Sequence, residues 1–236
     1  VEAVGSEGLS GQDLLSQQIF VRDTRAALSA AQHPGWMLPV NSYYNPATIM
    51  ALLGSGAGAQ RFNTVGDYEA WSRRSLGIPA LFNQAIENMR AGMAAGVVQP
   101  RALMEKVLPQ LDAVIAANAE DTLFWGPVRN FPEDFSQQDR QRLSAEYKRM
   151  IELRILPAYR ALRGFIATEY LPACRDSDGL GAMPDGAAWY AQNIAQATTL
   201  SRDAGQLHSL GQAEVDRLQE QIAQAMKAQR IRGKRP

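Results

Sequence analysis

Between Thr64 and Ala117, apolar side chains recur every three or four residues, the spacing of one face of an α-helix. The first half of this run holds Tyr68, Trp71, Ile78, Phe82, Ile86, Met89 and Met93. After a Gly-Val-Val-Gln-Pro break, the second half holds Leu103, Val107, Leu111 and Val114. Two amphipathic helices joined by a short connection predict a helical hairpin, which can seed a larger helical core.

The same spacing predicts helices elsewhere in the chain. We expect them at residues 11–32, 46–53, 136–170, 187–199 and 209–227. Pro109 and Pro157 fall inside predicted helices and should kink them, because proline lacks the N–H that a helix interior uses. No alternating apolar pattern long enough for a sheet is found. The sequence therefore predicts an all-α fold, a multi-helix array of long kinked antiparallel helices with more than half of the residues helical.

Polar side chains mark where several of these helices begin. Thr64 and Asp67 have the spacing of a capping box, in which each side chain bonds the backbone of the other. Ser10 and Ser136 also precede an aspartate by three residues. We therefore expect helix N-termini at all three places.

Other segments predict interruptions. Gly77 and Pro79 leave two alternatives, a kinked helix or one helix that ends and a second that begins. Residues 54–63 are rich in glycine and predict a flexible surface loop. Residues 118–134 contain three aromatic side chains, so that this loop is expected to pack on the core.

The size and charge of the chain limit its class. We expect residues 1–236 to form a single helical domain with a weak internal boundary at residues 171–184. Twenty-four basic and twenty-four acidic residues give a formal charge of zero, which argues against nucleic acid as a main partner. No apolar run approaches the roughly 18 residues of a membrane span. The short basic tail at residues 230–236 is expected to be solvated.

The residues that bind metals or act as nucleophiles are few. His33 and His208 lie far apart, and no H-E-x-x-H or C-x-x-C motif is present, so we expect no metal site in this chain. Cys174 cannot form an internal disulfide, and without a histidine base nearby it is best interpreted as an incidental thiol. Residues 54–58 (GSGAG) lack the preceding strand of a phosphate cradle. Helical glutamates such as Glu146 and Glu169 fit solvated faces with i,i+4 partners.

Several strings, in the same order along nearly the whole chain, resemble one family. They are DYEAW (67–71), NMRAGMAAGVVQPR (88–101), ILPAYR (155–160), EYLP (169–172), PDGAAWY (184–190), LHSLG (207–211) and EV (214–215). Together they resemble the bacterial family named domain of unknown function 885. Each string alone is weak evidence for the family, whereas the whole set in this order is specific to it.

The resemblance carries several implications. Full-length members resemble zinc-dependent peptidases of the gluzincin kind, often exported to the periplasm or lipid-anchored. Their metal site is expected in a H-E-x-x-P-G-H-H segment C-terminal of the strings above, and this chain does not contain it. The resemblance thus implies an N-terminal portion of a larger zinc-peptidase-like protein with a peptide substrate. None of the matched strings is a catalytic motif, so catalytic residues stay unknown.

Two functional hypotheses follow. In the first, the chain is a non-catalytic wall of a substrate cleft, and Tyr190 and His208 are the candidate substrate contacts. The alternative interpretation is structural. Tyr190 would then be a core aromatic residue, like Trp189, and His208 would form a hydrogen bond near the start of a helix. In the second hypothesis, the chain is a helical binding or structural module without hydrolytic activity.

The predicted C-terminal helix carries a stripe of apolar residues at helical spacing: Leu207, Leu210, Val215, Leu218, Ile222 and Met226. Left open, such a stripe favours self-association. We therefore expect a homodimer or aggregate through this helix, unless it folds back on residues 147–166 and the chain is a monomer.

Overall fold

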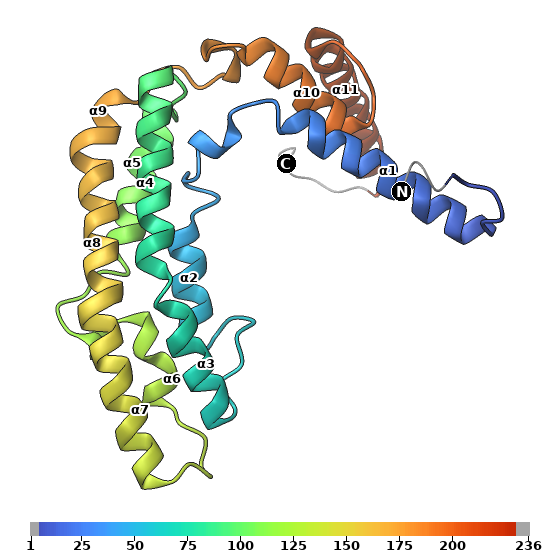
Figure 1. Cartoon of the computed structure of the whole chain (residues 1–236). Coiled ribbons are helices and arrows are strands. Elements are labelled where there is room, and N and C mark those ends of the chain that lie inside the picture. Colours follow the sequence, from blue (N-terminus) through green and yellow to red (C-terminus); the bar gives the residue numbers. More distant parts are fainter. Residues whose placement is uncertain (1–4, 230–236) are drawn as a thin grey trace. The chain divides into compact units, whose positions relative to one another are not determined.

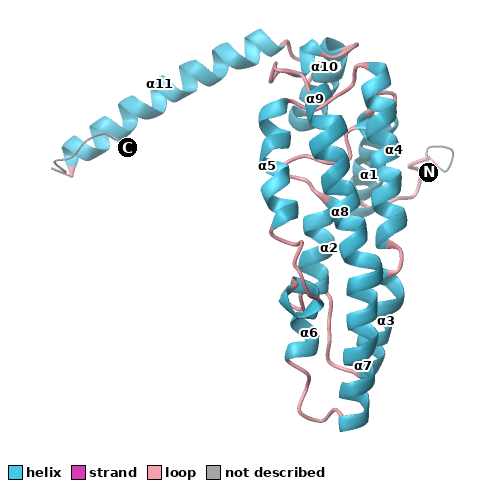
Figure 2. Ribbon diagram, turned by 90° about the vertical axis from the view of Figure 1, so that its left-hand side faces the viewer, coloured by secondary structure: helices cyan, strands magenta, loops and turns pink. Residues whose placement is uncertain are grey.

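The computed structural model describes residues 5–229, and all regular elements within these residues are helices (Figures 1 and 2). Helices account for 72% of these residues, and none of them belongs to a strand. A single isolated parallel bridge joins Pro100 to Arg175. The predicted all-α fold is therefore confirmed, while the basic tail at residues 230–236 lies outside the described residues.

The chain divides into two compact units, which we describe separately. Unit 1 combines Val1–His33 with Asp185–Pro236, and unit 2 is Pro34–Pro184. The change between them falls at the end of the boundary predicted at residues 171–184. The expectation of one domain over residues 1–236 stays a prediction.

Unit 2 contains most of the helices. Their bounds are η2 (Gly35–Met37), α2 (Pro46–Gly54), α3 (Val65–Ser75), α4 (Ile78–Ala95), α5 (Arg101–Asp112), η3 (Ala119–Asp121), η4 (Leu123–Trp125), α6 (Gly126–Arg129), α7 (Gln137–Met150), η5 (Ile151–Ile155), α8 (Leu156–Phe165), η6 (Ile166–Tyr170), α9 (Leu171–Ala173) and η7 (Leu180–Ala182). Helices α4 and α8 lie side by side, as do α3 and α7 (Figure 2). Unit 1 contains α1 (Gly11–Ala30), α10 (Gly186–Thr198) and α11 (Ala204–Ala228).

The hydrophobic core lies in unit 2. Its largest fully buried side chains are aromatic: Trp71, Tyr68, Tyr147, Tyr159 and Tyr170. The predicted hairpin helices contribute their apolar stripes to this core, and the loop at residues 118–134 contributes the buried ring of Phe124. Burial on this scale, at about 25 cal/mol per Å² of apolar surface, is the main stabilising contribution to the unit.

The predicted helix starts are confirmed. Thr64 and Asp67 form a capping box, with the Asp67 N–H donating to Thr64 Oγ1 at 3.2 Å and the Thr64 N–H donating to Asp67 Oδ2 at 2.9 Å. Ser10 and Ser136 accept from the backbone of the aspartate three residues on. At Gly77 the chain follows the second alternative, because α3 ends at Ser75 and α4 begins at Ile78.

The long helix predicted at residues 136–170 is helical without a break over residues 137–173, but it is not a uniform α-helix. Two π turns, η5 and η6, interrupt it. Each is followed by the same three residues, Leu-Pro-Ala, at 156–158 and 171–173. Proline cannot donate to the preceding turn, so each wide turn falls where a regular helix would be strained.

Three expectations need correction. The helix predicted to start at residue 209 begins at Ala204, with Asp203 as its N-cap, because that carboxylate accepts from two backbone N–H groups. Gly54, assigned to a flexible loop, is the last residue of α2 and packs against the rings of Phe124 and Trp71. Tyr190 is half-exposed rather than a core aromatic.

Candidate functional site

A groove in unit 2 lies between α2, the end of α5 and the segment from η3 to α6. Its volume is about 600 Å³, within the range of roughly 300–1,000 Å³ that is usual for ligand sites. Its surface is mainly apolar. The lining residues are Thr48, Ala51, Leu52, Ser55, Ala57, Gln110, Ala113, Val114, Asp121, Thr122, Leu123, Gly126 and Arg129.

Glycines set the walls of this groove. A Cβ atom at Gly54 would overlap the ring of Phe124, and one at Gly126 would overlap the carbonyl oxygen of Ser55. A Cβ at Gly58 would lie 2.9 Å from the carbonyl oxygen of Leu52. The end of α2 and the start of α6 therefore approach backbone to backbone, which only glycine allows. Gly54 and Gly58 therefore serve close packing, while residues 55–63 form a loop with several exposed residues.

The polar groups on the rim are held by partners within the protein. Gln110 Nε2 donates to the carbonyl oxygen of Ser42 at 2.9 Å, and Thr122 Oγ1 donates to the carbonyl oxygen of Ala119 at 2.7 Å. Arg129 donates to the carbonyl oxygen of Glu120 at 2.6 Å. Lys148 donates to the carboxylate of Glu120 at 2.7 Å, and this hydrogen bond lowers the pKa of that carboxyl group. The rim is thus fixed in shape.

Exposed apolar side chains flank the groove. Leu52 is 56% exposed and Leu123 is 50% exposed. A turn next to Gln110 presents Tyr43, which is 99% exposed. Asn41 Oδ1 holds this turn by accepting from the N–H groups of Tyr43 at 2.8 Å and Tyr44 at 2.6 Å. The arrangement offers apolar and aromatic contact area on a rigid support, the kind of surface that binds other molecules.

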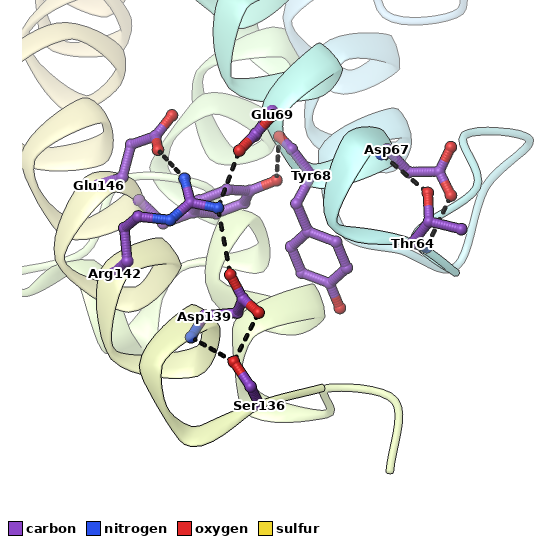
Figure 3. A network of polar contacts seen from close by, with 9 residues as sticks. Thr64, Asp67, Tyr68, Glu69, Ser136, Asp139, Arg142 and Glu146 are labelled. Atoms are coloured by element: carbon purple, nitrogen blue, oxygen red, sulfur yellow. Dashed lines mark hydrogen bonds and ion pairs between the residues drawn. The ribbon is translucent and has the colours of Figure 1, made fainter. Parts of the chain in front are cut away.

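A second polar cluster joins α3 to α7 (Figure 3). Arg142 lies 2.8 Å from Glu69, 3.5 Å from Asp139 and 3.8 Å from Glu146. The hydrogen bond to Glu69 is the main reason that the pKa of Arg142 is raised. These side chains are all about one-third exposed or more, so that solvent screens each pair and weakens its contribution to stability. The cluster is best understood as a link between two helices.

The residues predicted as substrate contacts lie in unit 1. Tyr190 is on α10 and His208 is on α11, and both side chains are exposed. No hydrogen bond or ring contact joins them among residues 5–229. His208 is in the second turn of its helix and not at its start. Their roles in substrate binding stay predictions.

The side chains within residues 5–229 do not form a set of ligands for the zinc that the resemblance implies. Within residues 5–229, no three His, Cys, Asp or Glu side chains converge as metal ligands would. His33 instead stacks on Trp189, with ring centroids 5.6 Å apart and planes 2° apart. Cys174 is buried, and burial raises the pKa of its thiol to about 11, which disfavours the thiolate that metals bind. We therefore derive no chemical step through zinc.

Sequence reasoning did not find the groove. Leu52 and Leu123 occur in segments where an apolar residue is expected to be buried, and only the packing of the backbone leaves them exposed. Gly54 and Gly58 are a usable signal, because glycine also occurs where a Cβ would collide with a ring or with the backbone.

Unit 2 is thus an all-helical fold with an apolar groove on its surface. The model of the family described as "Bacterial protein of unknown function (DUF885)" matches residues 1–234, and the chain belongs to this family. The fold is similar to the crystal structure of a putative lipoprotein from Colwellia psychrerythraea, with a TM-score of 0.74 and 20% sequence identity. That match covers 81% of this chain and 33% of the other, so this chain spans about a third of its length. No curated protein matches the chain.

Proposed function

We propose that this chain is a non-catalytic helical part of a longer, zinc-peptidase-like hydrolase, and that it lines a cleft for a peptide substrate. The groove beside α2 is the observation that carries this proposal. It is apolar, it is large enough for two or three side chains, and its polar rim is already satisfied, which suits binding better than bond cleavage. Any hydrolytic chemistry would belong to the part of a longer family protein that this chain does not match.

In this proposal, the groove accepts apolar side chains of an extended peptide. Leu52 and Leu123 would each lose exposed surface to the peptide, at about 25 cal/mol per Å². Tyr43 and Tyr44 would add flat contact area beside the groove at low entropic cost. Tyr190 and His208 are kept as separate candidate contacts, because they lie in unit 1 and not at the groove.

Binding of labelled peptides tests the proposal. The probes are a fluorescein-labelled nine-residue peptide rich in Leu and Phe, and a Gly/Ser peptide of equal length. We expect saturable binding of the first only, weakened at least tenfold by Leu52→Asp or Leu123→Asp, which corresponds to about 1.4 kcal/mol. Leu153→Asp is the matched control, since this leucine is 68% exposed and lies outside the groove. Equal binding of both peptides, or no loss in the groove variants, would refute the proposal.

Tyr190→Ala and His208→Ala belong to the same experiment. If these residues contact the peptide, each change weakens binding without altering the stability of unit 2. Unchanged affinity in both variants removes them as candidate contacts and leaves the groove assignment intact.

The alternative is a helical binding or structural module without hydrolytic activity. It is favoured by α11, whose 25 residues include no buried side chain, as expected for a helix that awaits a partner. A homodimer through α11 belongs to this alternative. Hydrolysis of the Leu/Phe peptide by a longer family protein, followed by mass spectrometry, separates the two readings, since the module hypothesis allows none.

The location in the cell is a further part of the proposal. The similar structure is that of a putative lipoprotein, which supports export and lipid anchoring here. No helix within residues 5–229 is both long and apolar enough to cross a bilayer. Cell fractionation with an epitope-tagged gene tests this point, and recovery only with soluble cytoplasmic markers would contradict it.

A further inference from the structure

Unit 1 has almost no hydrophobic core of its own. Of the 34 buried hydrophobic residues in the described chain, only Ile194 belongs to it. In contrast, 11 of the 19 large hydrophobic residues that are exposed belong to this smaller unit. Three helices that bury so little apolar surface cannot offset the conformational entropy lost on folding.

The exposed apolar residues of this unit lie mainly on its two long helices. On α11, Leu210, Val215, Leu218 and Ile222 are each 42–58% exposed, and they follow helical spacing. On α1, the exposed side chains include Leu15, Ile19, Phe20 and Leu28. The α11 residues form one apolar strip, which ordinary surface helices do not leave exposed. Those of α1 are spread around the helix, because a rotation of about 100° per residue places Phe20 and Leu28 away from Leu15.

The contacts between α1 and α10 do not replace a core. Ser29 Oγ donates to Gln192 Oε1 at 2.8 Å, and His33 stacks on Trp189. Both contacts lie toward the C-terminal end of α1 and involve polar or amphipathic side chains. Nearer the N-terminus of α1, Leu15, Ile19 and Phe20 stay exposed.

We infer that the apolar face of α11 is a docking surface for amphipathic helices of the remainder of a family-length chain. This inference rests on the proposed function only in placing the chain within a longer protein. The length of the similar structure supports that occupant, because the part matched here is 33% of it. The other two thirds of that protein provide enough chain to cover this face.

A second copy of this chain fits the α11 face less well. A helix of 25 residues is about 37 Å long and about 10 Å wide, so a pair of such helices buries a strip of roughly 400 Å² on each. Stable protein interfaces bury about 800 Å² on each partner.

Hydrogen exchange tests the inference on two proteins. In the isolated chain, we expect amides of α11 and of the first half of α1 to exchange at least 100-fold faster than those of α4 and α8. In a full-length protein of this family, the helix that the family alignment matches to α11 should be protected to the level of the core. Fast exchange of that helix in the full-length protein would overturn the inference.

Sedimentation of the isolated chain tests the other occupants. We expect weak, reversible self-association that Leu218→Glu abolishes and the matched polar-face change Gln219→Glu leaves unchanged. A dimer that persists at nanomolar concentration would assign the face to a second copy. A monomer with protected α11 amides would show that the chain covers the face itself. Either result overturns the inference, and neither bears on peptide binding at the groove.

Discussion

The hydroxyl group of Tyr147 donates a hydrogen bond of 3.0 Å to the carbonyl oxygen of Tyr68 (Figure 3). The hydroxyl group of Tyr68 in turn donates to the carbonyl oxygen of Pro127 at 2.9 Å. Both side chains are fully buried, so that their hydroxyl groups depend on these partners. Two tyrosines thereby connect α7, α3 and α6, the last of which forms one wall of the groove.

The first prediction concerns this connection. Tyr147→Phe removes one hydrogen bond and keeps the ring, so it should lower the free energy of unfolding by about 1 kcal/mol. Tyr147→Ala also leaves a cavity and should cost about 3–5 kcal/mol. Urea unfolding followed by circular dichroism measures both. Tyr43→Phe is the control, because this ring is 99% exposed, and a cost there equal to that at Tyr147 would contradict the assignment.

The second prediction concerns alkaline pH. Burial raises the pKa of Tyr68 from 10.0 to about 12, and it raises the pKa of Tyr147 and Tyr159 as well. Because the folded-state pKa of such a tyrosine lies above its unfolded-state pKa, its contribution to the free energy of unfolding is fully present below pH 10. This contribution falls as the pH rises toward 12. Between pH 10 and 12, the free energy of unfolding should fall by about 1.4 kcal/mol per pH unit for each such tyrosine. Urea midpoints at pH 8, 10 and 11 measure it.

A control for this titration is Tyr68→Phe. This variant is less stable at neutral pH, but its free energy of unfolding should fall less per pH unit above pH 10. The reason is that one tyrosine whose ionisation is coupled to unfolding has been removed. Identical slopes in the two proteins would show that Tyr68 does not resist ionisation in the folded state.

The third prediction concerns the groove walls. Gly54→Ala forces a methyl group into the ring of Phe124 and should destabilise unit 2 by about 1–3 kcal/mol. Gly164→Ala is the matched control within α8, where a Cβ would meet no atom within 4 Å. That change should be stabilising by up to about 1 kcal/mol, because alanine is the better helix former. A neutral Gly54→Ala would mean that the end of α2 is not in close contact with Phe124.

The fourth prediction concerns Cys174. Burial raises the pKa of this thiol from 9.0 to about 11, so the reactive thiolate should be about 100-fold scarcer at pH 8 than for a thiol with the ordinary value. Reaction with a chromogenic disulfide reagent should therefore be slow in buffer and fast in urea. Equal rates in the two solvents would place the thiol at the surface and reopen its interpretation as an incidental buried group.

Much of the fold could be predicted from the sequence, because local signals and tertiary packing agree there. Thr64 and Asp67 specify a helix start by their own hydrogen bonds, which need no distant partner. The apolar stripes of α4 and α5 mark the faces that the core covers. The choice at Gly77 and Pro79 stayed open, since either outcome satisfies the local chemistry.

The groove and the division into two units could not be predicted in this way. Whether Leu52 is buried depends on how α2 meets α6, which is set by backbone contacts between residues far apart in sequence. The exposed stripe on α11 was recognised from its spacing, but spacing does not say what covers a face. Tyr190 and His208 are selected from matched strings alone, and within residues 5–229 neither makes a hydrogen bond, ion pair or ring contact that would indicate a role.

The two π turns have a consequence for how relatives of this chain can vary. Tyr147, Ile151, Ile155 and Tyr159 follow steps of four residues, and all are fully buried. In a uniform α-helix each such step would rotate the side chain by about 40°, and three steps would carry it away from the core. A π turn encloses one residue more than an α turn, so it absorbs that drift. Single-residue insertions and deletions are therefore expected to concentrate at residues 151–155 and 166–170, where the helix can gain or lose a residue while both flanking stripes keep facing the core.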